Sequence, residues 1–447
     1  MQKLLDKMQT NGCIIEIYGL GYVGFPLAVK LASNGFNVIG VDVNSERISR
    51  LKRNELLDSE EFLKEKFIEC RKEKFSLTEK PETKELPKIG IICVPTPIPG
   101  PGINSDIYVK KAVESFLNNS KEGDCLILES SVEVGTTERI QEMIESKGFK
   151  IGINFGLSFC PERIDPANKE WGIENIPRII YSSDDTTFKI SKEIYNNVNN
   201  GNLIRVESPK VAEVVKSFEN AFRLVNISLV NELAILCDNL EINVKNVIDA
   251  AATKPFGFMA HYPGAGAGGH CIPKDPRFLL ESAKKRNSNF ETIEHALKIN
   301  EYMPKYICNS IEKELDVMGL KKTVLVCGLA YKANVEDMRD SPSFKIIQEM
   351  KKREFIIYGH DPFFDSKLSK KYLIENHISE LNFENIENMD YDLIKEISCL
   401  CIVQHHDESK MRIKEIYNKS LIPFIYDCQS KLVKNSQSKS HLEFLGN

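Results

Sequence analysis

Short apolar runs alternate with amphipathic stretches near both ends of the chain, and several of the runs stop at a glycine, a proline or a small polar residue. Such runs are typical of parallel strands whose two faces are both covered by helices. The alternation predicts an α/β fold built from doubly wound sheets. The predicted strands are residues 13–18, 36–42, 89–98, 125–132, 153–160, 322–331, 355–362, 398–403 and 424–428.

One stretch differs from the rest, because from Lys210 to Leu240 neither proline nor glycine interrupts a helical pattern. Apolar residues cover much of the circumference of this predicted helix, more than a single core-facing side requires. A second apolar surface must therefore be hidden, and pairing with an identical copy hides it most simply. We expect a homodimer formed through the 210–240 helix.

The chain has 447 residues, too many for one ordinary domain. The pattern predicts two Rossmann-like domains, residues 1–207 and 319–447, joined by a central helical domain, residues 208–318. In the last domain Asp361 follows a strand, as Asp42 does in the first domain. The last domain lacks the full glycine pattern of the first. We expect solvated helices over residues 51–88 and a loosely held end after Val433.

Charge and cysteine content exclude several classes of partner and indicate the compartment. The net charge is −5, with 59 basic and 64 acidic residues intermixed, so no basic field attracts nucleic acid or anionic lipid. No run approaches the roughly 20 apolar residues of a membrane span. Twelve cysteines without a CxxC pair indicate a reducing compartment. We expect a cytoplasmic protein with no nucleic-acid partner, no membrane partner and no metal site.

The first predicted strand runs directly into GLGYVG, a GxGxxG pattern with glycines at 19, 21 and 24 and Tyr22 and Val23 between them. Its place between a strand and a helix predicts a dinucleotide site, with the pyrophosphate at the helix N-terminus. Asp42 ends the second strand, where a carboxylate binds a ribose 2′-hydroxyl and repels a 2′-phosphate. NAD is therefore favoured over NADP, although Arg47 could soften that preference.

Two further strands end in small residues, Pro95 and Thr96 in one and Ser131 in the other. The carboxyl ends of strands form the ligand crevice of a doubly wound sheet, which makes these residues candidates for the site. The alternative is that the hydroxyl groups only cap the following helix.

The loop from His261 to Leu279 holds four glycines, three prolines and Cys271. Glycines let a backbone approach a ligand closely, and cationic neighbours such as His270 and Lys274 favour a thiolate nucleophile. The alternative is a surface loop with an inert cysteine.

In the long helix, Lys216 and Asn220 are four residues apart and share a face. There an ammonium and an amide could stabilise one developing oxyanion, unless Lys216 is only a surface lysine whose stem covers apolar neighbours.

Five motifs occur together in the chain: GLGYVG, CVPTP, KSFEN, GGHCIPKD and GLAYKANVEDMRDSP. Their order and spacing resemble the nucleotide-sugar 6-dehydrogenase family, which includes the UDP-glucose and the UDP-N-acetylhexosamine dehydrogenases, over essentially the whole chain. The resemblance implies an NAD-dependent enzyme that oxidises a sugar C6 alcohol through the aldehyde to a carboxylate. It also implies that the three domains bind NAD, form the dimer and carry the Cys271 loop, and bind the UDP-sugar, respectively.

The resemblance implies a role for each candidate residue. Cys271 would add to the aldehyde and carry a thiohemiacetal and then a thioester, and Lys216 and Asn220 would hold the C6 oxygen. Asp275 would orient Lys216 or the hydrolytic water, and Ser131 would lie near that water. The NAD contacts would be Gly19, Gly21, Tyr22, Val23, Gly24, Asp42, Arg47, Pro95, Thr96 and Arg339. The substrate contacts would be Arg163, Lys216, Gly266, Gly268, Gly269 and Lys332.

One departure from the family concerns the base for thioester hydrolysis. UDP-glucose dehydrogenases have a second glutamate four residues after the first in this region, whereas here Pro166 follows Glu162 at that distance. Glu162 is then the candidate base. The motifs PERIDPAN and TKPFGFM instead resemble the branch acting on UDP-N-acetylglucosamine or UDP-N-acetylmannosamine. Lys274 and Arg277 depart from that branch, which more often has apolar or aromatic residues there.

Three alternatives remain open. UDP-glucose could be the substrate in place of an N-acetylhexosamine. A hydroxyacid dehydrogenase would produce one NADH per substrate and leave Cys271 without a covalent task. A catalytically silent nucleotide-binding protein would not need the cysteine, lysine, asparagine and aspartate that are all present.

Overall fold

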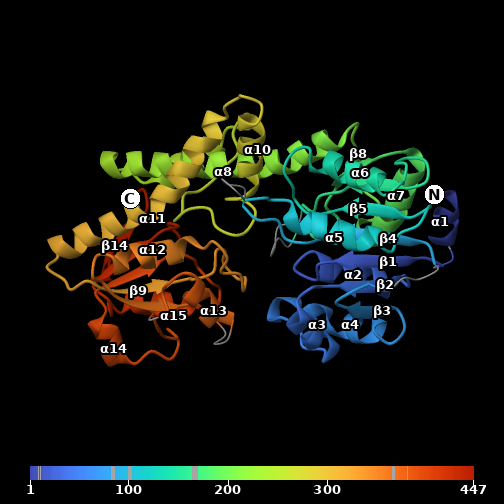
Figure 1. Cartoon of the computed structure of the whole chain (residues 1–447). Helices are drawn as coiled ribbons and strands as arrows, with labels where there is room; N and C mark the ends of the chain where they lie inside the picture. Colours follow the sequence, from blue (N-terminus) through green and yellow to red (C-terminus); the bar gives the residue numbers. More distant parts are fainter. Residues whose placement is uncertain are drawn as a thin grey trace. The chain divides into compact units, whose positions relative to one another are not determined.

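The computed structural model describes residues 1–8, 10, 12–81, 86–98, 103–163, 170–364, 368–379 and 381–447. They form two compact units, each built around one sheet (Figure 1). The first unit comprises Met1–Glu219 and Arg277–Asn289, and the second comprises Asn220–Pro276 and Phe290–Asn447. The finer division into three domains stays a prediction.

The sheet of the first unit has eight strands in the order β3-β2-β1-β4-β5-β6-β7-β8. Neighbouring strands are parallel except β6 and β7, which are antiparallel. The strands are β1 Ile14–Tyr18, β2 Asn37–Val41, β3 Phe75–Thr78, β4 Lys88–Ile92, β5 Cys125–Leu128, β6 Gly156–Phe159, β7 Arg178–Ser182 and β8 Leu203–Arg205.

Strand β1 shows why the central strands are apolar throughout. Ile15 and Ile17 enter the core on one face of the sheet, and Ile14 and Tyr18 enter the core on the other. The one charged residue of the strand, Glu16, is buried, and its carboxylate accepts a hydrogen bond of 2.9 Å from the Tyr18 hydroxyl. Burial on both faces explains the uninterrupted apolar runs of the sequence.

The second unit repeats the strand order of the first. Its six strands are all parallel, in the order β11-β10-β9-β12-β13-β14, which matches β3-β2-β1-β4-β5-β6 position for position. This repeat confirms the predicted fold class of two Rossmann-like doubly wound sheets. The strands are β9 Thr323–Cys327, β10 Ile356–His360, β11 Asn382–Phe383, β12 Cys399–Ile402, β13 Phe424–Asp427 and β14 His441–Phe444.

Helices cover both faces of each sheet, as the core residues show. In the first unit they are α1 Gln2–Met8, α2 Gly24–Ser33, α3 Ser45–Lys52, η1 Asp58–Leu63, α4 Lys64–Cys70, α5 Ile107–Leu117, α6 Thr136–Ser146 and α7 Asp185–Asn199. In the second they are α9 Val244–Ala252, α11 Glu291–Val317, α12 Pro342–Lys351, α13 Leu368–Glu375, α14 Tyr391–Glu396 and α15 Lys410–Asn418. Helix α8, Pro209–Leu240, and helix α10, Asp275–Lys284, contribute residues to both units.

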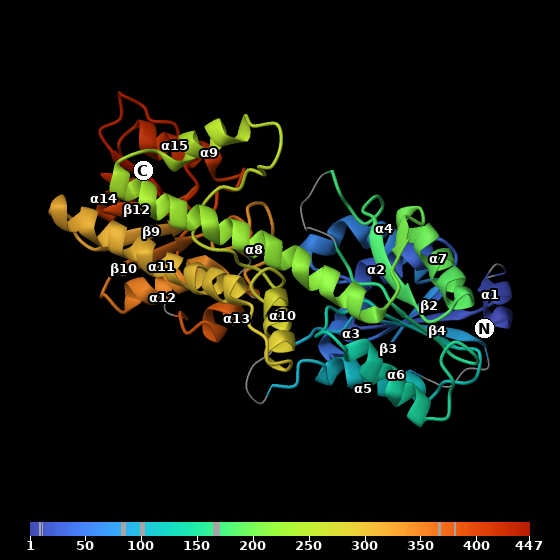
Figure 2. The same ribbon diagram turned by 90° about the horizontal axis from the view of Figure 1, so that it is seen from above.

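The predicted long helix is confirmed as α8. In the second unit it lies beside α11 (Figure 2), where the Ser228 hydroxyl donates a 2.7 Å hydrogen bond to the Ala296 carbonyl. Within the described part of the chain, α8 alone is long and apolar enough to cross a membrane by length and composition. The expectation that no segment would approach this limit was therefore wrong. Ala234 and Cys237 of α8 nevertheless belong to the core of the second unit, as in a core helix of a globular fold.

Two segments differ from their predicted structure. Residues 51–88 were expected to be solvated helices, but they include the edge strand β3, and Phe67 is fully buried. The end after Val433 was expected to be loose, but β14 pairs with β13 and Leu445 is fully buried. Both strands have only four residues of mixed polarity, so their local pattern does not indicate a strand. They form strands because each pairs with a neighbouring strand.

Candidate active site

The glycines of GLGYVG serve different ends. Gly19 follows β1 with a φ of +91°, and a Cβ on Gly24 would lie 1.9 Å from the Gly19 carbonyl oxygen. These two glycines permit the turn and the close packing of α2 on β1. A Cβ on Gly21 would have no atom within 4 Å, so that the middle of the loop borders open space. A phosphate group needs such space to approach a backbone closely.

Asp42 lies beside this loop at the end of β2. Its carboxylate accepts hydrogen bonds from the backbone N–H groups of Leu20, at 2.8 Å, and Asn44, at 2.9 Å. Arg47 donates from Nε to the Leu20 carbonyl, at 3.0 Å, and from Nη2 to Glu60, at 2.6 Å. Both members of the Arg47–Glu60 pair are largely buried. The Glu60 carboxylate therefore neutralises the Arg47 guanidinium, which could otherwise have attracted the 2′-phosphate of NADP.

The loops after β4 and β5 are joined by side chains. The Thr96 hydroxyl donates to the Ser131 carbonyl, at 2.8 Å, and the Ser130 hydroxyl donates to the Val94 carbonyl, at 2.6 Å. The Ser131 hydroxyl itself makes no hydrogen bond within the described residues. The strand ends thus bring Thr96 and Ser131 together, as predicted for a crevice at this edge of the sheet.

Helix α6 is capped by a residue that the sequence did not single out. The buried carboxylate of Glu213, on α8, accepts hydrogen bonds from the Gly135 N–H, at 2.6 Å, and from the Thr137 hydroxyl, at 2.7 Å. Ser131 therefore does not cap this helix. The KSFEN motif begins only three residues after Glu213, but nothing in the sequence links Glu213 to residues 135–137.

Arg163 is held by an ion pair in the first unit. Its Nη2 and Nε bind the two carboxylate oxygens of Glu219, at 2.5 and 3.1 Å, and its Nη1 donates to the Pro177 carbonyl, at 2.7 Å. Its neighbour Glu162 is half-buried. Pro166, on which the comparison with UDP-glucose dehydrogenases depends, lies outside the described residues.

Cys271 differs from the other cysteines of the chain. All twelve are free, and Cys271 alone is exposed. Burial makes several of the other thiols hard to ionise: it raises the pKa of Cys13 to about 11 and that of Cys160 to about 12. Cys93 is partly buried and the other ten are buried, so Cys271 is the thiol most open to a ligand in solvent.

The loop that carries Cys271 is held in a fixed shape inside the second unit. The Asn300 side chain forms two hydrogen bonds with the backbone of Ala267, at 2.6 and 3.0 Å, and the Gly269 N–H donates to the Arg339 carbonyl, at 3.0 Å. A Cβ on Gly268 or Gly269 would lie within 3.0 Å of Tyr331. The glycines are therefore required for close packing on protein, and substrate contact through their backbone stays a prediction.

Polar side chains flank Cys271 on both sides. The Lys274 ammonium lies 3.0 Å from Nε2 of His270 and 3.8 Å from a carboxylate oxygen of Asp275. The other oxygen of Asp275 accepts a 2.7 Å hydrogen bond from the Asn220 amide. Burial, with the charges of Lys274 and Arg339, lowers the pKa of His270 to about 3. His270 is thus neutral near pH 7, and its Nε2 accepts a hydrogen bond from the Lys274 ammonium.

The remaining candidates lie on α8 and on the loop after β9. Lys216 and Asn220 are both buried and lie about one turn apart on α8, so Lys216 is not a surface lysine. Arg339 forms a two-point ion pair with Asp337, whose shortest distance is 2.6 Å. Lys332 is half-buried.

The turn after β9 corresponds to the turn after β1, but a nearby carboxylate binds two of its backbone N–H groups. Asp361 accepts the N–H groups of Leu329 and Ala330, at 2.7 and 2.8 Å, and lies 3.1 Å from His406. In the first unit Asp42 takes only the Leu20 N–H of the corresponding turn. The second turn therefore uses two of its backbone N–H groups to bind its own carboxylate, and its glycine pattern is incomplete.

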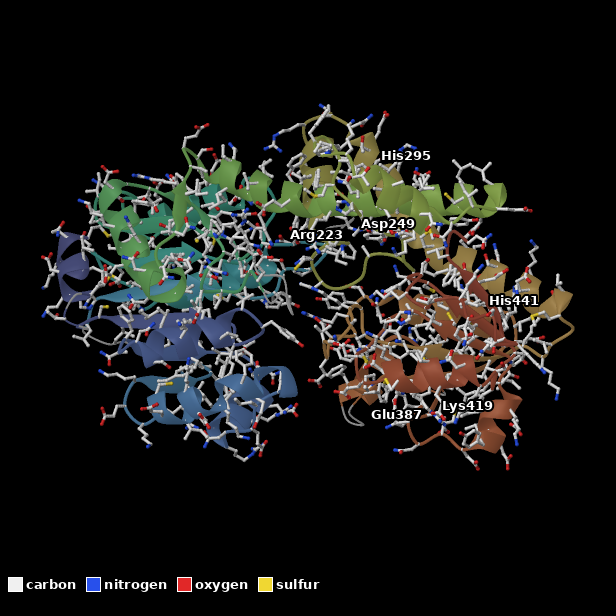
Figure 3. The ribbon with its side chains drawn as sticks, turned by 180° about the vertical axis from the view of Figure 1, so that it is seen from behind. Arg223, Asp249, His295, Glu387, Lys419 and His441 are labelled. Carbon is white, nitrogen blue, oxygen red and sulfur yellow. The ribbon has the colours of Figure 1, made fainter. Side chains whose placement is uncertain are left out.

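One group of side chains could hold a metal ion among the residues that the structure describes. Glu314 on α11 and His441 and Glu443 on β14 have ligand atoms within 4.8 Å of one another. His441, labelled in Figure 3, lies 3.3 Å from Glu443 and 3.7 Å from Glu314. A protonated His441 would form an ion pair with both carboxylates. The group shares no residue with the predicted site.

The first unit has the strand–turn–helix of a dinucleotide-binding domain, and the second unit carries the exposed thiol of Cys271. Three domain models of the UDP-glucose/GDP-mannose dehydrogenase family match the chain: the NAD-binding domain at residues 13–199, the central domain at 210–302 and the UDP-binding domain at 325–434. The chain belongs to this family. The predicted family, the predicted cofactor NAD and the predicted class of NAD-dependent nucleotide-sugar dehydrogenase are confirmed.

Individual relatives are similar over most of their length. The UDP-N-acetyl-D-mannosamine dehydrogenase of Methanococcus vannielii is 34% identical over 444 residues, 97% of each chain. The UDP-N-acetyl-D-glucosamine 6-dehydrogenase of Salmonella typhi is 33% identical over 366 residues, 79% of this chain and 83% of that protein. The solved UDP-D-ManNAc dehydrogenase of Pyrococcus horikoshii has a TM-score of 0.81 at 27% identity, covering 97% of this chain and 99% of that one.

Proposed function

We propose that this protein oxidises the C6 alcohol of a UDP-N-acetylhexosamine, of the ManNAc or GlcNAc type, to the uronic acid. The observation that carries the proposal is the exposed Cys271 in a loop fixed by Asn300 and Arg339 and flanked by Lys274 and Asp275. The names of the full-length relatives favour an N-acetylhexosamine over UDP-glucose, the alternative substrate.

The residues of the first unit fit NAD. The open space at Gly21 would admit the pyrophosphate, and Asp42 would bind the adenosine ribose. NAD, when bound, supplies the hydride acceptor for both oxidation steps. Thr96 and Ser130 keep the loops after β4 and β5 in place beside this site, and Arg339 is a further proposed contact.

In the first oxidation, Lys216 and Asn220 would stabilise the negative charge that develops on the C6 oxygen. Their burial strengthens that interaction, because little water competes with it. The hydrogen bond from Asn220 to Asp275 fixes the amide so that it need not reorganise during the reaction.

In the second oxidation, the Cys271 thiolate would add to the aldehyde carbon and form a thiohemiacetal, which can lose hydride where a free aldehyde cannot. The resulting thioester would be cleaved by a water molecule near Ser131, with Glu162 as the base. The Lys274 ammonium, three residues after Cys271, would favour the thiolate over the thiol.

We also propose a cytoplasmic homodimer. Twelve free thiols fit a reducing compartment. On α8 the apolar side chains of Phe222, Leu229 and Leu236 remain exposed in the single chain, as a dimer surface requires.

The test is the formation of NADH over a panel of UDP-sugars. We expect two NADH per sugar with UDP-N-acetylmannosamine or UDP-N-acetylglucosamine, and a lower kcat/KM with UDP-glucose. Cys271→Ser should retain at most a slow first oxidation, because a hydroxyl is a far weaker nucleophile near pH 7. One NADH per substrate, or full turnover by the serine variant, would refute the covalent mechanism.

A further inference from the structure

Helix α8 holds the segment that carries Glu162. The Glu219 carboxylate receives two hydrogen bonds from the Arg163 guanidinium, a bidentate arrangement that fixes both distance and orientation. The third bond of Arg163, to the Pro177 carbonyl, anchors the same guanidinium to the segment before β7. Both carboxylate and guanidinium are partly buried, with side chains 34% and 22% exposed, so the pair is only partly screened by solvent.

Glu162 is fixed on its other side as well. Cys160, two residues earlier, is fully buried, and its N–H donates to the Leu128 carbonyl of β5 at 2.8 Å. The backbone that carries Glu162 is therefore held between the end of the sheet and the Arg163–Glu219 pair, within a span of four residues.

A buried cation lies near the same carboxylate. Arg178 is fully buried and pairs with Glu129 at 2.8 Å, while its Nε and Nη2 atoms make no hydrogen bond within the described residues. Although burial alone would lower it, the pKa of Arg178 is raised well above its usual value by Glu129 and, more weakly, by Glu162. Glu162 is thus within electrostatic range of the buried Arg178–Glu129 ion pair.

We propose that Glu219 is a positioning residue for thioester hydrolysis, and that it acts through Arg163 to hold Glu162. This inference rests on the proposed function, since it concerns the step in which Glu162 takes a proton from water. In that step the water oxygen bonds to the thioester carbon, the C–S bond breaks, the thiolate of Cys271 leaves, and the proton passes to Glu162. A base displaced by even one ångström from such a water loses most of its effect.

The proposal separates the two halves of the reaction. Loss of the Glu219–Arg163 pair leaves Lys216, Asn220 and Cys271 unchanged, so that both oxidations should proceed and hydrolysis alone should slow. The acyl-enzyme then accumulates. A merely structural role for Glu219 would instead reduce all steps together.

The experiment uses Glu219→Gln in the full chain, with NAD and UDP-N-acetylmannosamine or UDP-N-acetylglucosamine, whichever the panel selects. Acid quenching and intact-protein mass spectrometry follow the acyl adduct on Cys271, and absorbance follows NADH. We expect a burst of two NADH per site, accumulation of the adduct and a kcat at least tenfold lower with KM little changed. Arg163→Lys, which keeps the charge but loses the fork, should also accumulate the adduct.

Two further variants complete the design. Asp185→Asn removes the exposed Asp185–Arg205 ion pair of the same unit and should match the wild type. The charge swap Arg163→Glu with Glu219→Arg should recover turnover relative to either single change. A Glu219→Gln enzyme that turns over normally, or that slows without accumulating adduct, would overturn the proposal. Failure of the proposed function would give a different result, because then neither the wild type nor any variant would form an adduct.

Discussion

Gly21 and Gly24 lie three residues apart in one loop, yet their surroundings require glycine for different reasons. A methyl group on Gly24 would meet the Gly19 carbonyl oxygen, which is backbone and cannot turn aside. A methyl group on Gly21 would meet no protein atom and would extend into the space proposed for the pyrophosphate. Gly24 is therefore required by the fold, and we expect Gly21 to be required by the proposed pyrophosphate.

This contrast predicts opposite results for two matched substitutions. Gly24→Ala should lower the free energy of unfolding by about 2–3 kcal/mol through overpacking, visible as a lower thermal midpoint. Gly21→Ala should leave the thermal midpoint of the free protein unchanged and weaken NAD binding about tenfold or more. Calorimetry and NAD titration measure the two effects. A destabilised Gly21→Ala protein with normal NAD affinity would contradict the assignment.

At the scale of elements, the Cys271 loop is shaped by contacts that come from several parts of the second unit. Asn231 of α8, Asn300 of α11 and the Arg339 carbonyl each bind its backbone. None of these contacts involves Cys271 itself, so that the loop can be rigid while the thiol stays exposed. A reactive group on a rigid support is what the proposed chemistry needs.

The same loop should make the protein sensitive to acid. In the unfolded chain His270 takes up a proton near pH 6.5, whereas in the folded protein its pKa is about 3 because of burial and the neighbouring Lys274 and Arg339. Between these values the unfolded state binds more protons, so the free energy of unfolding decreases as the pH falls from 6.5 toward 3. The decrease for this one group is at most about 1.4 kcal/mol per pH unit.

His270→Gln tests this expectation, because its amide oxygen can still accept a hydrogen bond from Lys274 but cannot titrate. Urea unfolding from pH 4.5 to 7.5 should show a shallower loss of stability in the variant than in the wild type. The comparison is needed because the pKa of His360 is also lowered, to about 4, by burial, and His360 titrates in both proteins. Identical pH slopes would contradict the prediction.

At the scale of the whole molecule, one surface of the second unit remains uncovered in the single chain. Phe222, Leu229 and Leu236 are exposed at intervals of seven residues, which places them on one stripe of α8. Phe256 and Met259, from the loop after α9, are exposed as well. That loop is tied to α9 by a 2.7 Å hydrogen bond from the Tyr262 hydroxyl to Asp249.

Such a stripe predicts that Leu229→Arg together with Leu236→Arg converts the proposed dimer into a monomer. Two buried charges per subunit without partners would cost more than the surrounding apolar contact contributes. Light scattering coupled to gel filtration measures the mass. Met411→Arg, at an exposed apolar position on α15, is the matched control and should not change it. A wild-type protein that is monomeric and fully active at assay concentration would refute the dimer.

The sequence by itself determined the features that depend on local pattern. Unbroken apolar runs predicted strands that are buried on both faces, and a long stretch without proline or glycine predicted helix α8. The motif GLGYVG between a strand and a helix predicted a dinucleotide turn. These features follow from backbone geometry and from the burial that each element needs. For the same reason the fold class could be predicted, whereas the family was predicted from the order and spacing of five motifs.

Only the tertiary structure decided which side chains meet. Arg163 and Glu219 are 56 residues apart, and Arg47 and Glu60 are paired although either could have been a surface charge. The strands β3 and β14 formed because a neighbouring strand was available at each site, which no local pattern records. Long-range pairing depends on how elements pack, and a single sequence specifies that packing only through the sum of all its contacts.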